Sequence, residues 1–103
     1  MFSLVLTTVK NRAEAKRLSE KLVSEKLAAC VSALPDVNST YRWRGKLERT
    51  REVLLLIKTS NKKLNRLIPR IKELHSYEVP EILVVPIERG SHEYLKWIDE
   101  SLR

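Results

Sequence analysis

Two side chains of types that hold metal ions stand out, and they lie far apart in the chain. Cys30 is the only cysteine, and a thiolate is a soft ligand that suits copper and other thiophilic metals. His75 offers an imidazole, a ligand for copper and other divalent metals. Each also has a purely structural interpretation. Cys30 stands among small apolar residues typical of a core, and a histidine at a helix C-terminus is favoured by the helix dipole.

The sequence contains no complete catalytic signature. It has no glycine-rich phosphate loop, no G-x-S-x-G, no H-E-x-x-H and no C-x-x-C. Glu78 and Glu81 follow His75 closely, but carboxylates beside the start of a strand are common surface residues. One cysteine and two histidines would also need carboxylates to complete a zinc site within one chain. We therefore predict that the protein is not an enzyme.

The net charge of +7 is unevenly distributed. Residues 42–72 carry a net charge of +9, and the rest of the chain carries −2. A basic middle suits nucleic acid, an acidic partner or a small anion, but a solvated hairpin tip and helix face is the preferred explanation. An RNA-recognition module would need aromatic side chains across its sheet, and residues 46–53 contain none. An acylphosphatase-like enzyme would need a phosphate-binding loop, and residues 9–13 lack glycine. Nucleic acid and phosphate chemistry are both disfavoured.

The N-terminal half is expected to form a strand, a helix and a second strand. Residues 2–9 are apolar and β-branched enough for a central strand. Asn11 is placed as an N-cap with Glu14 completing a capping box, and the helix should end near residue 26. Residues 27–34 are expected to form the second strand. A bend or bulge is expected at Pro35-Asp36, before the strand resumes toward Tyr41.

A hairpin is expected around Gly45, because glycine accepts a positive φ in a tight turn. Tyr41 and Trp43 would share one face of its first arm. In the second arm, residues 53–57 form an apolar run that fits a strand covered on both faces. Residues 46–52 are polar, so the tip cannot be core. Because a lone two-stranded ribbon is marginal in water, we predict that this arm pairs with another subunit.

The C-terminal half is expected to form a helix, a strand and a final helix. Ser60 or Asn61 should cap the first of these helices, which Pro69 is expected to kink. Residues 79–88 are expected to form a fourth strand, and its two prolines place it at a sheet edge. Ser91 should cap the last helix. Its expected inner residues are Tyr94, Leu95, Ile98 and Leu102, with Trp97 adjoining.

The predicted order βαββαβ with a terminal helix indicates an α+β, ferredoxin-like sandwich with strand order 4-1-3-2. We expect one domain over residues 1–103, since few glycines and prolines are available for a linker. The first strand is too short for a signal peptide or a membrane span. Together with the unpaired cysteine, this predicts a cytoplasmic protein.

Ordered motifs along almost the whole chain resemble the CutA family of divalent-cation tolerance proteins. The motifs are Leu6-Thr7-Thr8-Val9, Leu27-Ala28-Ala29-Cys30-Val31, Tyr41-Arg42-Trp43-Arg44-Gly45-Lys46, the run from Glu52 to Thr59, the run from Leu74 to Ile82, and Tyr94-Leu95-Lys96-Trp97-Ile98. Ser32, Ser76 and Pro69 depart from what this family usually carries.

The resemblance implies a homotrimer built, as in the P-II class, by joining sheets edge to edge. It also implies copper(II) or another divalent metal as ligand, not required for folding, with Cys30 and His75 at the metal-binding positions. Residues expected to line clefts between subunits are Trp43, Lys58, Tyr77, Glu78, Glu81 and Trp97. The alternative interpretation is a P-II-like trimeric sensor that binds a small anionic ligand between subunits, with Lys58 and Arg42 as candidate contacts. No downstream partner is indicated.

Overall fold

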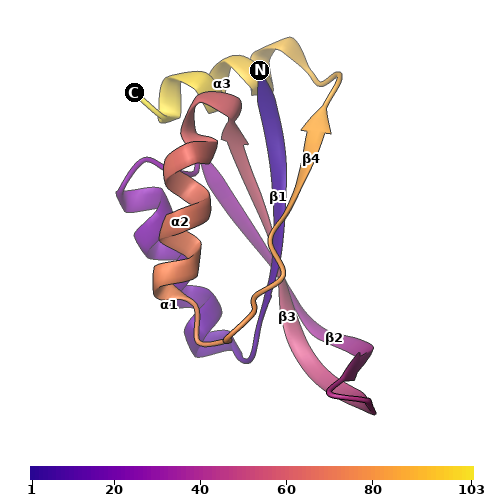
Figure 1. Ribbon diagram of the computed structural model, residues 1–103. Coiled ribbons are helices and arrows are strands. Elements are labelled where there is room, and N and C mark those ends of the chain that lie inside the picture. Colours follow the sequence, from indigo (N-terminus) through magenta and orange to yellow (C-terminus); the bar gives the residue numbers. More distant parts are fainter.

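The computed structural model describes all 103 residues, and its elements follow the predicted order (Figure 1). The strands are β1 (Phe2–Val9), β2 (Cys30–Trp43), β3 (Lys46–Ser60) and β4 (Leu83–Ile87). The helices are α1 (Arg12–Ser24), a 3-10 turn η1 (Asn61–Lys63), α2 (Leu64–Leu74) and α3 (His92–Ser101).

All four strands form one antiparallel sheet in the order β2-β3-β1-β4, which confirms the predicted arrangement. β1 lies in the middle and pairs with β3 along its full length, from Phe2↔Ser60 to Val9↔Val53. β4 pairs only with β1, as expected for a strand that contains Pro86. The α+β, ferredoxin-like fold predicted from the sequence is therefore present.

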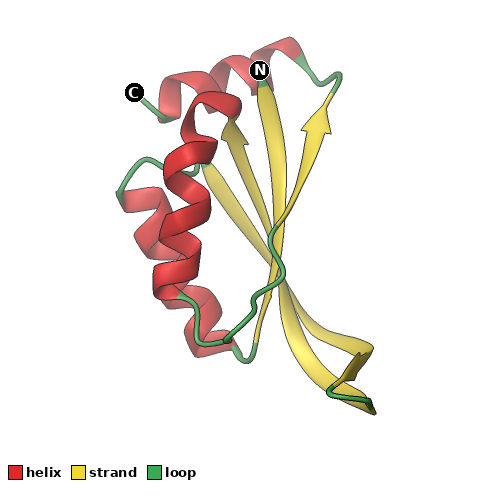
Figure 2. Cartoon of the chain, viewed as in Figure 1, coloured by secondary structure: helices red, strands yellow, loops and turns green.

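Two helices, α1 and α2, lie on one side of this sheet (Figure 2), and the main core lies between them and the sheet. Val5, Leu55 and Ile57 on the sheet, with Leu18 and Leu67 on α1 and α2, are at most 1% exposed. α3 closes the end of the sheet nearest the N-terminus, where a smaller cluster contains Ala29, Ile98 of α3 and Leu102, the residue that follows this helix. The helices thus bury every second residue along most of β1 and along the second half of β3.

The opposite face of the sheet carries apolar side chains that no helix covers. The strand register places on it Leu4, Leu6, Leu34, Leu54, Leu56, Leu83 and Val85. Leu34 is 46% exposed and Leu83 is 54% exposed. We call this surface the open face. Residues 53–57 are therefore covered fully on one side only by this chain, whereas the sequence predicted a strand covered on both faces.

A β-bulge at Pro35-Asp36 reverses which β2 side chains share a face with β3. Before it, Leu34 pairs with Leu54, and after it Val37 pairs with Glu52. Asp36 takes a φ of 60°, and the extra residue shifts the alternation by one. The shift brings the odd-numbered residues of β2, Tyr41 and Trp43 among them, to the side of Glu52. The predicted bulge is confirmed.

Beyond the end of β1, β2 and β3 continue as a two-stranded ribbon that projects from the body (Figure 1). We call residues 37–52 the arm. Its turn is made by Arg44 and Gly45, both at positive φ, which suits a two-residue hairpin. The arm gives the chain its elongated extents of 44 × 25 × 23 Å. Only β2 and β3 pair there, as the sequence predicted.

Two strand boundaries differ from expectation. Residues 27–29 were predicted to begin the second strand, but β2 begins at Cys30. The N–H groups of Leu27 and Ala28 donate to the Leu22 carbonyl and close α1, while the Ala29 N–H already donates to the Lys58 carbonyl of β3. Lys26 takes the positive φ typical of such an end. The fourth strand was predicted from residue 79 but begins at Leu83. The preceding segment contains Pro80, which has no N–H to donate to a sheet.

The helix predictions were partly wrong. Neither Ser60 nor Asn61 caps the second helical segment with its side chain, and η1 leads directly into α2. α2 runs through Pro69 without a break. Ser91 does cap α3, since its Oγ accepts from the Tyr94 N–H at 3.3 Å. Tyr94, however, is exposed rather than turned inward, because the end of the sheet accommodates only Ile98 and Leu102 fully.

Candidate functional site

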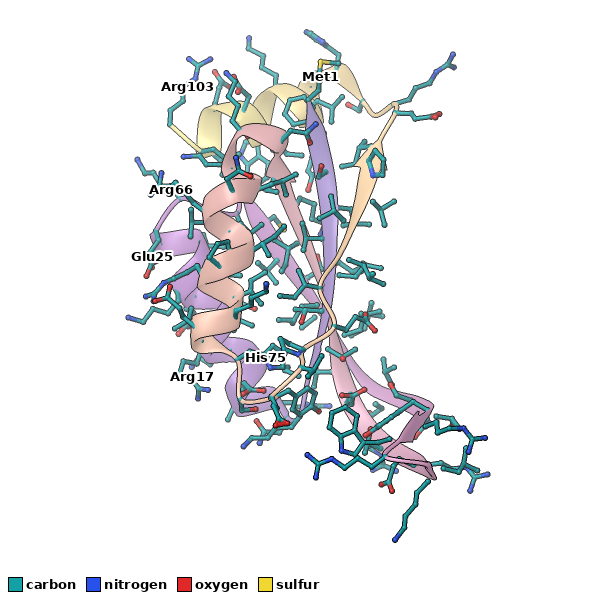
Figure 3. All side chains as sticks on the ribbon, in the orientation of Figure 1. Met1, Arg17, Glu25, Arg66, His75 and Arg103 are labelled. Atoms are coloured by element: carbon teal, nitrogen blue, oxygen red, sulfur yellow. The ribbon has the colours of Figure 1, made fainter.

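A groove of about 720 Å³ lies at the base of the arm, between β2, β3 and the segment that follows α2 (side chains in Figure 3). Its chemically distinctive lining residues are Tyr41, Trp43, Glu52, Tyr77, Glu78 and Glu81. Four of these, Trp43, Tyr77, Glu78 and Glu81, were predicted as cleft residues. The groove therefore brings together most of the cleft residues inferred from sequence, within a single chain.

Glu52 and Tyr77 join the two walls of this groove. The Tyr77 hydroxyl donates to Glu52 Oε2 at 2.6 Å. Burial, followed by this hydrogen bond to a carboxylate, raises the pKa of Tyr77 above its ordinary value. Tyr77 therefore stays neutral as a donor, and Glu52, only 7% exposed, stays fixed beside the groove.

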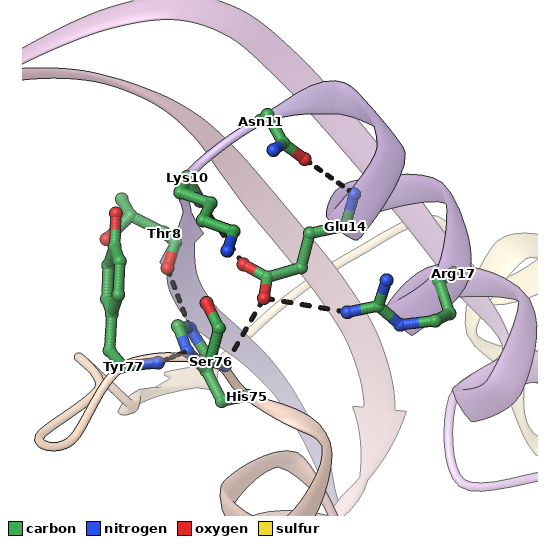
Figure 4. A network of polar contacts seen from close by, with 8 residues as sticks. All are labelled: Thr8, Lys10, Asn11, Glu14, Arg17, His75, Ser76 and Tyr77. Carbon is green, nitrogen blue, oxygen red and sulfur yellow. Dashed lines mark hydrogen bonds and ion pairs between the residues drawn. The ribbon is translucent and has the colours of Figure 1, made fainter.

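His75 positions the segment that carries Tyr77 (Figure 4). Its Nδ1 accepts from the Tyr77 backbone N–H at 3.1 Å, which leaves the proton on Nε2. Nε2 in turn donates to the Thr8 carbonyl at 2.8 Å. Both ring nitrogens of this buried imidazole are therefore engaged within the chain. A metal ion could bind His75 only by replacing one of these hydrogen bonds.

Glu14 holds the same segment from the side of α1 (Figure 4). Its buried carboxylate accepts from the backbone N–H of Lys10 at 3.3 Å and from that of Ser76 at 3.2 Å, and Arg17 lies 3.7 Å away. Burial alone would raise the pKa of Glu14, but the hydrogen bonds from Ser76 and Lys10, with His75 nearby, lower it overall. Asn11 caps the helix as expected, since its Oδ1 accepts from the Glu14 N–H. The Glu14 carboxylate bonds the backbone N–H of Lys10, one residue before the cap, where a regular capping box would use that of Asn11.

Cys30 lies at the other end of the sheet, on the open face. It pairs with Lys58 across the strands, and the Lys58 ammonium lies 3.7 Å from its sulfur while also donating to Ser32 Oγ. Partial burial and the neighbouring Cys30 thiol raise the pKa of Tyr94. Tyr94 stacks on Trp97 with ring centroids 5.6 Å apart. Two predicted cleft residues, Lys58 and Trp97, therefore belong to this end and not to the groove.

The structure does not bring the two predicted metal-binding residues together. Cys30 lies level with Leu4 of β1, and His75 bonds the carbonyl of Thr8 four residues along the same strand, a distance of about 13 Å at 3.3 Å per residue. Nowhere in the chain do three His, Cys, Asp or Glu side chains gather closely enough to hold a metal ion. One chain alone thus supplies no closed metal site.

Sequence reasoning missed Glu52 and Tyr41 as lining residues of the groove. Both belong to the arm, and their facing depends on the bulge at Pro35-Asp36. The bulge itself was predicted. Shifting the alternation of β2 by one residue at the bulge would have placed Tyr41 on the same face as Glu52, so the sequence did contain this signal. The hydrogen bond from Tyr77 spans 25 residues and had no signal in the sequence.

The groove is negatively charged. Three glutamates are among its twelve lining residues, which include no lysine, arginine or histidine. Arg44 lies at the rim, with its guanidinium over the Trp43 ring at 5.5 Å from the centroid and 3.6 Å from Glu78. A small anion, the ligand of the alternative prediction, is therefore disfavoured in this groove as one chain forms it. Arg42, one of its two candidate contacts, does not line the groove.

No helix in the structure is long and apolar enough to cross a membrane. A family model described as CutA1 divalent ion tolerance protein matches residues 3–101. The divalent-cation tolerance protein CutA of Thermus thermophilus is 44% identical over 101 residues, which are 98% of each protein. Protein CutA 1, chloroplastic, of Oryza sativa is 43% identical over 97% of this chain, which spans 56% of that longer protein.

A solved structure has the same fold. The protein from Archaeoglobus fulgidus, described as the periplasmic divalent cation tolerance protein CutA, superposes with a TM-score of 0.96. It is 38% identical, and the match covers all of both chains. Likeness in sequence and in structure therefore extends over the groove, the arm and the open face alike.

Proposed function

The chain belongs to the family of CutA1 divalent ion tolerance proteins, and from this premise we propose that it takes part in the tolerance of divalent metal ions as a homotrimer without catalytic activity. The observation that carries the proposal is the match over residues 3–101, which takes in nearly every element of the fold. The proposed ligand is copper(II) or another divalent metal ion.

The open face supports assembly into a trimer. It carries leucine and valine side chains from all four strands, among them Leu34 and Leu83, both about half exposed. Contiguous apolar surface of this kind marks an interaction site on a protein. The arm and the free edges of β2 and β4 add unpaired backbone groups that another strand would satisfy. Edge-to-edge joining of three copies uses both features.

Assembly also accounts for the division of the predicted cleft residues into two groups. Trp43, Tyr77, Glu78 and Glu81 line the groove, whereas Lys58 and Trp97 lie near Cys30 at the far end of the sheet. These two groups meet only if a neighbouring subunit contributes one of them. We therefore place the cleft between subunits.

Cys30 and His75 are the proposed metal contacts, and the structure gives them different surroundings. The Cys30 sulfur is partly exposed, and a metal ion would replace the Lys58 ammonium beside it. His75 would have to release Thr8 or Tyr77 first. Because one chain holds no closed site, the remaining ligands would come from other subunits.

Two measurements test this proposal. Light scattering coupled to gel filtration at micromolar concentration should give the mass of three chains, and a monomer would contradict the assembly. Titration with copper(II), followed by calorimetry, should show binding in a fixed ratio to chains that Cys30→Ala and His75→Ala each weaken. If both variants bind copper as the wild type does, these residues are structural.

The cytoplasmic location predicted from the single unpaired cysteine is also part of this proposal. The Archaeoglobus protein is described as periplasmic, so the two locations need to be separated by experiment. Fractionation of cells that express the tagged full chain would do so, and recovery in the periplasmic fraction would contradict the prediction.

A further inference from the structure

We propose that the face of the arm that points away from the groove binds an extended acidic segment of another protein. This partner class goes beyond the proposed role in metal tolerance and does not depend on it. We call this surface the arginine face. It consists of three residues of β2 and the three that pair with them on β3, namely Asn38, Thr40, Arg42, Leu47, Arg49 and Arg51.

The strand register places three arginines on this face. Arg49 and Arg51 are two residues apart on β3, so their side chains point to the same side of the ribbon. Arg42 of β2 lies opposite Leu47, which belongs to the same alternating set, and therefore shares the face. The bulge at Pro35-Asp36 is what turns Arg42 to this side. Neighbouring arginines are thus about 7 Å apart at the backbone.

The arginine face remains accessible when the subunits assemble as proposed. The alternation of β3 that contains Arg49 and Arg51 continues into Leu55 and Ile57, which are buried under the helices. The arginine face is therefore on the helix side of the sheet, opposite the open face and the groove. Pairing through strand edges, together with a cleft built on the groove, uses other surfaces. Arg42, Arg49 and Arg51 are all exposed.

The arginine face contains no carboxylate. Of the ten arginines in the chain, five lie within 4.0 Å of a carboxylate oxygen, namely Arg12, Arg17, Arg44, Arg70 and Arg103. Three of the other five are gathered on this one face. Like charges at neighbouring positions of a sheet are destabilising, so this grouping does not serve the folding of the arm. Carboxylates of a partner would remove the repulsion.

The residue type and the spacing both favour an extended acidic peptide. Arginine presents a planar fork that binds a carboxylate through two hydrogen bonds, which the lysine ammonium does not offer. Alternate residues of an extended peptide are also about 7 Å apart. Glu or Asp at every second position of such a peptide would therefore meet successive arginines of the face.

Three observations favour a peptide over nucleic acid as the anionic partner. No aromatic side chain lies on the arginine face, so nothing there stacks on the bases of a single strand. Proteins that read a DNA duplex as oligomers match its two-fold symmetry, whereas the proposed trimer has no two-fold axis. Leu47, which is 59% exposed on this face, suits an aliphatic side chain of a peptide better than a sugar-phosphate backbone.

Fluorescence anisotropy of a labelled peptide of alternating Glu and Thr residues, titrated with the assembled full-length protein, tests the proposal. Saturable binding in a fixed ratio to chains is expected at low ionic strength, and it should weaken as salt is raised to about 0.15 M. The triple variant Arg42→Gln, Arg49→Gln and Arg51→Gln should weaken binding about tenfold. Replacing the same three arginines with lysine keeps the charge but loses the fork, and should weaken binding about threefold.

The matched control removes the same amount of charge from another part of the surface. It is the triple variant Lys16→Gln, Lys21→Gln and Lys62→Gln, at exposed positions on α1 and η1. Its affinity for the peptide should stay close to that of the wild type. Light scattering should show that the arginine variant and the control assemble as the wild type does.

Four outcomes would overturn the proposal. The first is no saturable binding at low ionic strength. The second is equal weakening by the arginine variant and the control, which would show a general attraction to a basic protein. The third is loss of the trimer in the arginine variant, which would show that a neighbouring subunit covers this face. The fourth is tighter binding of a DNA duplex through the same arginines, which would make the face a nucleic-acid site. Copper titration of the same samples reports separately on the proposed metal role.

Discussion

The two faces of the central sheet differ in how completely this chain buries their apolar side chains and hydrogen-bonds their polar groups. On the helix side, Leu55 and Ile57 are fully buried, and the polar groups of Glu14 and His75 are hydrogen-bonded within the chain. On the open side, Leu34 and Leu83 are about half exposed, and the Glu52 carboxylate has an oxygen without a donor. The helix side therefore maintains the fold, while assembly and ligand contact are expected on the open side.

The largest effect is expected when charged residues are introduced on the open face. The double substitution Leu34→Lys and Leu83→Lys should abolish the trimer, because assembly would then bury two ammonium groups in apolar surroundings. Light scattering should report a monomer, and far-UV circular dichroism should remain close to that of the wild type. Val23→Lys, at an exposed apolar position on α1, is the control and should stay trimeric. A trimeric double variant would show that the open face is not the interface.

The next effect compares neighbouring residues on opposite faces. Leu55→Ala should lower the free energy of unfolding by about 2–5 kcal/mol, since it leaves a cavity under the helices. Leu56→Ala on the half-buried open face should cost less in dilute solution, where subunits are apart, and more as protein concentration rises. Urea unfolding at two protein concentrations would measure both. Equal and concentration-independent losses would remove the distinction between the faces.

A smaller loss is expected at the polar network of the helix side. Glu14→Gln replaces an acceptor oxygen with an amide that faces an N–H donor, and should cost about 1–3 kcal/mol at neutral pH. Because the folded protein lowers the pKa of Glu14, its stabilising contribution is present above the pKa of the unfolded chain. That contribution is lost as the pH falls through the lowered folded value.

The difference in stability between wild type and Glu14→Gln should therefore shrink in acid. Urea unfolding at a series of pH values from 7 to about 3 would follow it. Glu20→Gln on the exposed side of α1 provides the comparison. A difference that stays constant with pH would mean that the charge of Glu14 does not contribute.

The smallest effect is expected at Tyr77, on the side that is less complete. Tyr77→Phe removes one hydrogen bond to Glu52, whose carboxylate can then be reached from the groove, so the loss should be about 1 kcal/mol. Alkaline titration followed by tyrosine absorbance should at the same time lose a group with a raised pKa. Tyr41→Phe is the matched control on the arm. Loss of a group that titrates at about 10, the ordinary tyrosine value, would show that Tyr77 ionises like an exposed tyrosine.

Much of the fold was predictable because its signals are local. The N-caps at Asn11 and Ser91, the turn at Gly45, and the bulge at Pro35-Asp36 follow from the preferences of these residue types. The strand order followed from right-handed crossovers. Boundaries failed where tertiary contacts decide, as at Leu27 and Ala28, whose N–H groups close α1, so that β2 begins only at Cys30.

The site was less predictable because its contacts cross the fold. Glu14 was read as a capping residue, yet its carboxylate also holds Ser76, 62 positions away. His75 was read as a metal ligand or a helix cap; it is the C-cap residue of α2, and its ring in addition joins Thr8 to Tyr77. Only the tertiary fold shows that Cys30 and His75 lie at different levels of β1.

The bulge at Pro35-Asp36 decides which side chains of the arm share the face of Glu52. Between the pairs Leu34↔Leu54 and Val37↔Glu52, β2 has two residues and β3 has one, so the odd-numbered Tyr41 and Trp43 follow on the face of Glu52. The same sequence paired without a bulge would place Asp36 opposite Glu52 and bring the even-numbered Thr40 and Arg42 to that face. One extra residue in β2 therefore gives the base of the arm an aromatic recess where unbroken alternation would give a basic one.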